Sequence, residues 1–282
     1  MTAESGFFSS GDLKLHYLRW GDPEGIPVVM LHGLRAYAQT WGPLANELGS
    51  QFCVYALDQR GRGDSDWGKV EDYCTEVYVS DLKAMVDALS LDSFILVGHS
   101  LGGTNALEFC RLYPERVRAM VIEDIGPGSS NQGAGAERIR REMRNTPLSF
   151  ENWSKAEAFW RNSRPNLSAA GIRARLQFSM KEDKNGRVVW KHDQLGIAEA
   201  RLTITPIDLW PAVKQVQCPT LLVRGGSSDF LPASTVQDIV QINPCFESIE
   251  VPDASHYVHD DQPVLFNSSV GNFIRYVANK DG

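Results

Sequence analysis

The sequence predicts an α/β fold built on a mostly parallel sheet. Short apolar runs rich in β-branched residues alternate with longer stretches in which apolar residues recur at helical spacing. Such alternation is typical of βα units, whose strands lie parallel in one sheet. The run at residues 94–97 is uniformly apolar, as expected of a central parallel strand that is covered on both faces.

The elements follow in order along the chain. Residues 13–20 alternate like a half-solvated strand, and Gly21 begins the turn after it. Buried strands are expected at 27–31, 52–57, 94–97, 119–122, 220–223 and 247–251, and helices at 41–48, 79–89, 101–113, 234–241 and 263–277. The βα rhythm is lost between residues 127 and 213, where loop-like clusters and amphipathic stretches appear. We therefore expect a core domain of residues 1–126 and 214–282, with residues 127–213 inserted as a cap.

Composition and charge limit the classes of function. The chain has 282 residues, of which 43% are hydrophobic and 22% charged, as in a globular protein with a large core. Its net charge of -7, with no long basic run, argues against nucleic acid or an anionic membrane as partner and favours a small-molecule substrate. No signal peptide or membrane anchor is visible, so a cytoplasmic location is expected. Five scattered cysteines without a CxxC pair indicate reduced thiols. The sequence leaves the oligomeric state open.

The segment Gly98-His99-Ser100-Leu101-Gly102 matches the G-x-S-x-G pattern of a nucleophile elbow and stands between an expected strand and an expected helix. Glycines on both sides permit so tight a turn, which lifts the serine hydroxyl clear of the sheet. Ser100 is therefore the candidate nucleophile, and the amide of Leu101 the candidate oxyanion donor. A serine that only caps the following helix is the structural alternative.

A serine nucleophile needs a base and an acid that orients the base. His256 follows the strand at 247–251 and is the candidate base. Asp229 follows the strand at 220–223, on a loop at the carboxyl end of a strand, and is the preferred acid; the chain order is then Ser, Asp, His. Asp124, at the end of the strand before the cap, remains the alternative acid. His259 is expected to be a solvated neighbour of the base.

Further candidates line the expected site. The amide of Leu34, after the strand at 27–31, is the second oxyanion donor. Arg35 follows it directly and is a tentative contact for an anionic substrate. Trp153 and Trp160 belong to an aromatic stripe of the cap and are tentative substrate contacts, although such stripes more often form a core.

The chain resembles the α/β-hydrolase superfamily along nearly its whole length. The resemblance rests on four landmarks in order: Leu31-His32-Gly33, Asp58-Gln-Arg-Gly-Arg-Gly-Asp-Ser65, Gly98-His-Ser-Leu-Gly-Gly103 and Asp253-Ala-Ser-His256. It implies an eight-stranded, mostly parallel sheet flanked by helices, with a helical cap after the sixth strand. It also implies the triad roles above and no metal or organic cofactor.

The expected reaction is acyl transfer to water by a serine hydrolase, on a small carboxylic ester or lactone. An amide or C–C bond hydrolase acting on a carboxylate-bearing catabolite is the first alternative. A second is a ligand-binding receptor of the same fold that turns over slowly. A perhydrolase or lyase using the same site is a third.

Overall fold

The computed structural model describes residues 1–280 and confirms the expected α/β fold. Eight strands form one sheet in the spatial order β1-β2-β4-β3-β5-β6-β10-β11. Their bounds are β1 (Glu4–Ser10), β2 (Leu13–Gly21), β3 (Ile26–Leu31), β4 (Phe52–Leu57), β5 (Phe94–His99), β6 (Val117–Glu123), β10 (Thr220–Gly225) and β11 (Phe246–Val251). The pairings β1–β2 and β2–β4 are antiparallel and the others parallel, so the carboxyl ends of six strands meet at one edge.

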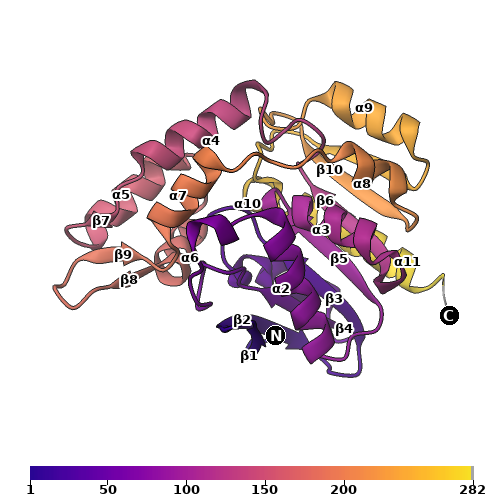
Figure 1. Ribbon diagram of the computed structural model, residues 1–282, viewed down its shortest axis with the longest axis horizontal. Coiled ribbons are helices and arrows are strands. Elements are labelled where there is room, and N and C mark those ends of the chain that lie inside the picture. The colour runs from indigo at the N-terminus through magenta and orange to yellow at the C-terminus, as the bar shows by residue number, and fades with distance from the viewer. Residues whose placement is uncertain (281–282) are drawn as a thin grey trace.

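Helices cover both faces of this sheet (Figure 1). They are α1 (Gly42–Leu48), α2 (Thr75–Ala88), α3 (Leu101–Leu112), α8 (Trp210–Gln215), α9 (Ala233–Ile242), α10 (Val258–Asp261) and α11 (Pro263–Ala278). Short 3-10 turns occupy Ala38–Trp41, Val70–Asp72 and Pro114–Arg116. Within residues 1–280, no helix is both long enough and apolar enough to cross a membrane.

Alternation along the central strands builds two cores. On β3, Val28 and Met30 pack with α1 and α11, whereas Val29 and Leu31 pack with α2 and α3 on the other face. This period of two is what a pleated strand produces. Because each central strand contributes apolar side chains to both cores, these strands read as continuous apolar runs and were predictable from sequence.

Between β6 and β10 the chain forms a group of helices and a small sheet beside the main sheet, at the left of Figure 1. Its elements are α4 (Gly133–Asn145), β7 (Ser149–Phe150), α5 (Trp153–Ser163), α6 (Ala169–Ser179), β8 (Met180–Glu182), β9 (Val188–Trp190) and α7 (Gln194–Thr203). The aromatic stripe mostly forms a core of its own here, with Phe150, Trp160 and Trp190 buried together. The expected boundary at 213 falls inside α8, which packs on α3 as part of the main core.

Candidate active site

Ser100 stands at the turn between β5 and α3, with a left-handed backbone (φ 51°, ψ −114°). This conformation is costly for a residue with a side chain and persists only where the surroundings enforce it. A Cβ on Gly98 would lie 2.4 Å from the carbonyl oxygen of Gly102, and one on Gly102 would lie 2.2 Å from that of Leu31. Both glycines of the motif are therefore needed for the turn to pass the neighbouring backbone.

His256 contacts Ser100 and Asp124 together. Its Nε2 lies 2.9 Å from Ser100 Oγ, and its Nδ1 lies 2.8 Å from Asp124 Oδ2. With the proton on Nδ1 donated to the carboxylate, Nε2 accepts the serine proton. Both His256 and Asp124 are buried, and Phe230 packs against the imidazole with its ring centroid 4.1 Å away. The three groups have the relative placement of a catalytic triad.

The prediction that Asp229 orients His256 is wrong on this geometry. Its carboxylate accepts two hydrogen bonds from Arg138, at 2.7 and 2.8 Å, and is about one-third exposed. The hydrogen bond from Arg138 is the largest influence on Asp229 and lowers the pKa of its carboxyl. The alternative acid, Asp124, takes the place beside His256.

The loop after β10 supports Asp124 instead of replacing it. The amide of Gly225 donates to Asp124 Oδ1 at 2.9 Å, and the hydroxyl of Ser228 donates to Oδ2 at 2.5 Å. Asp124 is wholly buried, so these donors and His256 supply its hydrogen bonds.

His259 is also misplaced by the sequence analysis, because it is buried rather than solvated. Its Nδ1 donates to Glu123 Oε1 at 2.8 Å, and its backbone amide donates to the same oxygen at 3.0 Å. Burial opposes a charge on His259, but the Glu123 and Asp260 carboxylates outweigh it and raise the pKa of the imidazole. The two consecutive acidic residues at the end of β6 therefore both contact the segment of His256: Glu123 bonds His259, and Asp124 bonds His256.

His99 fixes the same loop from below. Its Nε2 donates to the backbone oxygen of His256 at 2.9 Å. Burial, the largest cause, holds the pKa of His99 well below its usual range, so the ring stays neutral. His99 therefore lies beneath the elbow and holds the loop of His256 in place.

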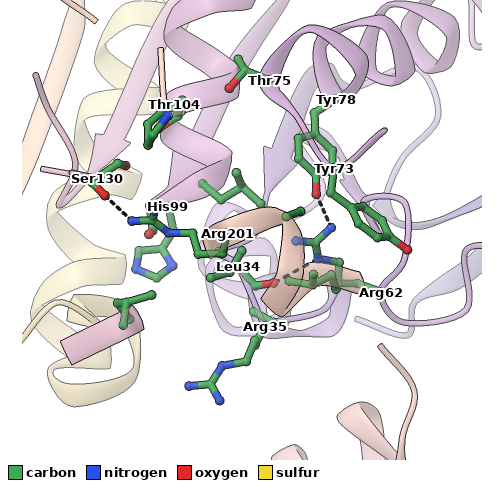
Figure 2. A pocket seen from close by; sticks show the side chains of 18 of the residues that line it. Leu34, Arg35, Arg62, Tyr73, Thr75, Tyr78, His99, Thr104, Ser130 and Arg201 are labelled. Atoms are coloured by element: carbon green, nitrogen blue, oxygen red, sulfur yellow. Dashed lines mark hydrogen bonds between the residues drawn. The ribbon is translucent and has the colours of Figure 1, made fainter. Parts of the chain in front are cut away.

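The amides of Leu34 and Leu101 are available as oxyanion donors. Leu101 is the first residue of α3, where a helix leaves its amides without an internal partner. No acceptor for either amide is present among residues 1–280. Arg62 Nε donates to the carbonyl of Leu34 at 3.0 Å and thereby holds that peptide, as Figure 2 shows.

A cavity with an empty volume of about 1170 Å³, part of it open to solvent, lies above Ser100. Both parts of the chain line this cavity: Leu34 and Leu101 belong to the core, and Ile139 and Trp160 belong to the insertion between β6 and β10. Apolar side chains and a few charged groups therefore surround the nucleophile, as in small-molecule sites.

The structure places the three predicted substrate contacts differently. Trp160 is buried and lines the cavity. Trp153 is 40% exposed, bonds Glu182 and is not among the lining residues, so its prediction is wrong. Arg35 lies at the cavity wall, but its guanidinium is taken up by Glu142 at 2.5 Å and Thr146 at 2.8 Å.

Sequence reasoning missed four further arginine contributions to the cavity: Arg62, Arg164, Arg175 and Arg201. Arg62 belongs to a loop that was recognised as a landmark but assigned no contact with the site. The other three are scattered through the insertion at no motif spacing, so only the folded chain brings them together.

Two groups of side chains within residues 1–280 lie close enough to surround a metal ion. They are His99, Glu123 and His259, and His16, Asp58 and Asp64. Hydrogen bonds inside each group already pair histidine with carboxylate, at 2.8 Å for His259 and Glu123 and 2.7 Å for His16 and Asp58. These pairs explain the burial of His259, Glu123, His16 and Asp58, and we assign no ion to either group.

Comparison with known proteins shows the family of the chain. Residues 26–263 match the family model of the α/β hydrolase fold, and the chain belongs to that family. It is 30% identical over 247 residues to a 2-(acetamidomethylene)succinate hydrolase of Mesorhizobium japonicum, covering 88% of this chain and 87% of the relative. It is 32% identical over 258 residues to a putative 2-succinyl-6-hydroxy-2,4-cyclohexadiene-1-carboxylate synthase of Bacillus subtilis, covering 88% and 89%. A crystal structure of E-2-(acetamidomethylene)succinate hydrolase superposes with a TM-score of 0.88 at 27% identity, covering 97% and 100%.

Proposed function

We propose that this protein is a serine hydrolase that cleaves an ester or amide bond of a small, carboxylate-bearing compound, with Ser100, His256 and Asp124 as its triad. The observation that carries the proposal is the continuous hydrogen-bonded chain from Ser100 Oγ through His256 to Asp124, at the base of a cavity. A serine that merely capped α3 would bond the helix amides, and Ser100 makes no such bond.

The geometry supports a two-step acyl transfer. His256 Nε2 takes the proton of Ser100 Oγ as that oxygen bonds to the substrate carbonyl carbon. The carbonyl oxygen becomes an oxyanion, which the amides of Leu34 and Leu101 stabilise. The bond to the leaving alkoxide or amine then breaks, and His256 returns the proton to it. Water, deprotonated by His256, releases the acid from the acyl-enzyme and restores Ser100.

Asp124 keeps His256 in the tautomer that this sequence of proton transfers needs. It is buried, accepts hydrogen bonds from three donors, and lies where it can stabilise the imidazolium that forms in each step.

The choice of bond is the finer part of the proposal. An ester or lactone was the first expectation from sequence. An amide is the second candidate, because the relative from Mesorhizobium japonicum is named for a substrate that holds an acetamide beside a succinate. The same triad serves both bonds, since only the leaving group differs.

Residues 127–213 act in this proposal as the cap over the cavity. Their contribution of Ile139, Trp160 and Ile197 to the cavity wall supports that role. The small-molecule partner and the cytoplasmic location expected from sequence remain part of the proposal.

The first experiment is labelling with a fluorophosphonate probe, which reacts only with an activated serine. We expect the wild type to be labelled and Ser100→Ala not. Turnover of short-chain p-nitrophenyl esters and of the matching anilides then separates esterase from amidase activity. A folded wild type that takes no label and turns over neither series would contradict the proposal and favour a ligand-binding receptor.

A further inference from the structure

The cavity above Ser100 is positively charged although the whole chain is acidic. Five arginines line it against one acidic residue, Glu76, while the net charge of the chain is -7. Such a concentration of one sign of charge in a low-dielectric cleft attracts ligands of the opposite sign.

Two of these arginines are neutralised by acidic residues behind the wall. Arg35 pairs with Glu142 at 2.5 Å, and Arg175 pairs with Asp260. Both ion pairs hold the insertion against the core, so these two charges are already balanced. Arg62 and Arg201 pair with no carboxylate in residues 1–280, but each donates a hydrogen bond to a backbone oxygen.

Arg164 has no such partner. Its guanidinium finds no hydrogen-bond acceptor and no carboxylate within 4.0 Å anywhere in the described part of the chain. It lies instead over the ring of Tyr257, with the guanidinium carbon 3.1 Å from the ring centroid. Burial lowers the pKa of Arg164 to about 10; Tyr257 and Glu142 oppose this shift, and the charges of Arg175 and Arg35 add to it. A partly buried cation without a directly paired carboxylate is stabilised by an added anion.

Arg164 lies close to the proposed base, because the Tyr257 ring beneath it packs against His256. Tyr257 follows the proposed base directly, and its ring centroid lies 5.0 Å from that of His256. Arg164 therefore lies on the side of the cavity where His256 contacts Ser100.

A second, independent observation concerns Trp160, one helical turn before Arg164 at the end of α5. Its indole Nε1 is buried and has no hydrogen-bond acceptor among residues 1–280. An unpaired buried donor costs about 1–3 kcal/mol, a cost that a ligand supplying the acceptor would remove. Arg164 caps the carboxyl end of α5, its amide bonded to the carbonyl of Trp160, and both side chains line the cavity.

We propose that Arg164, assisted by the indole N–H of Trp160, is the subsite for a carboxylate of the substrate, separated from the scissile carbonyl by a short chain. This rests on the proposed function, because it names the substrate class of the same site. Arg and carboxylate match in geometry, since the planar guanidinium offers paired donors to two oxygens.

The kinetic test compares two esters with the same acyl chain length, p-nitrophenyl hydrogen succinate and p-nitrophenyl butyrate. In Arg164→Ala we expect kcat/KM for the succinate ester to fall roughly 10- to 100-fold, as for the loss of a charge-assisted hydrogen bond. The butyrate ester is expected to change by less than about threefold. Arg164→Lys should recover part of the loss.

Arg161→Ala is the matched control, because Arg161 lies on the same helix but is exposed and paired with Glu157. It should leave both esters unaffected. An equal loss for both esters in Arg164→Ala would assign the residue a structural role and overturn the subsite. No loss for either ester would overturn it as well.

A binding measurement separates this inference from the proposed function. Succinate is titrated calorimetrically into Ser100→Ala, which cannot turn over, and into Ser100→Ala combined with Arg164→Ala or Arg161→Ala. We expect Kd to weaken at least about 10-fold with Arg164→Ala only. Retained binding with an unlabelled wild type would contradict hydrolysis but keep the subsite, whereas equal Kd in all three proteins would contradict the subsite alone.

Discussion

Two neighbouring strands of the sheet each end in an acidic loop, and the two loops differ in almost every physical respect. At the end of β6, Asp124 follows the strand directly and is wholly buried. Beyond β10, Asp229 lies four residues past the strand end, about one-third exposed, in an ion pair with Arg138. The comparison teaches that an acid orients a buried base only where neighbouring backbone and side chains supply the donors that replace water.

The two loops also have different roles at the site. Asp124 has a left-handed backbone (φ 52°), and its amide donates to the carbonyl of Val223 on β10 at 2.8 Å. The β10 loop then returns Gly225 N and Ser228 Oγ to the carboxylate. The loop after β6 carries Asp124, and the loop after β10 supplies hydrogen-bond donors to its carboxylate.

The largest expected effect is on the acid itself. Asp124→Asn should lower kcat about 10⁴-fold, because an amide favours the wrong tautomer of the base. Asp229→Asn, the matched change in the other loop, should lower it less than about threefold. Steady-state kinetics on one ester measures both, and the reverse order would restore Asp229 as the acid.

The next effect concerns Glu123, which we regard as a positioning residue. Glu123→Gln should destabilise the fold by about 3 kcal/mol, because it leaves His259 without its buried partner. It should also lower kcat with little change in KM, since the loop of His256 loosens. Glu250→Gln, at an exposed pair on β11, is the control for chemical denaturation and kinetics.

The same pair predicts a pH dependence of stability. The pKa of His259 is higher in the folded protein than in the unfolded chain. The stability that its charge contributes is therefore fully present below the unfolded pKa and is lost as pH rises through the folded pKa. As pH rises above the ordinary pKa of histidine, 6.5, the free energy of unfolding should therefore fall in the wild type more than in Glu123→Gln. Parallel curves for the two proteins would show that His259 carries no linked charge.

A smaller effect tests the support given by the β10 loop. Ser228→Ala removes one donor to Asp124 and should lower kcat/KM by roughly 10-fold, as for a charge-assisted hydrogen bond. Ser227→Ala, whose hydroxyl makes no contact with Asp124 in residues 1–280, should change little. Equal rates in the two variants would mean that Ser228 does not contribute to the acid.

The smallest effect lies in the exposed pair. Breaking the contact of Asp229 with Arg138 should cost less than about 1 kcal/mol, because solvent screens a half-exposed ion pair. The lowered pKa of Asp229 makes this contribution present above its ordinary pKa and lost as pH falls through the folded value. Wild type and Asp229→Asn should therefore converge in stability on acidification, and a double-mutant cycle with Arg138→Ala measures the pair.

Local patterns determined much of this protein from sequence alone. The strands, the glycine-bounded turn at Ser100 and the candidate base His256 follow from apolar periodicity and from short motifs, which act over a few neighbouring residues. The first strand, β1, went unassigned because its exposed face breaks the apolar pattern.

Only the tertiary structure distinguished the surroundings of Asp124 from those of Asp229, and showed which cavity arginine has no hydrogen-bond acceptor among the described residues. Chain order and loop position suited both aspartates, whereas the donors that favour Asp124 come from Gly225 and Ser228, a hundred residues away. Likewise Arg35 stands next to the candidate oxyanion residue in sequence, but in the folded chain it pairs with Glu142, whereas Arg164 lies over Tyr257 and has no hydrogen-bond acceptor among residues 1–280. Charges and hydrogen bonds act through space, so their partners depend on the packing of segments that the sequence keeps far apart.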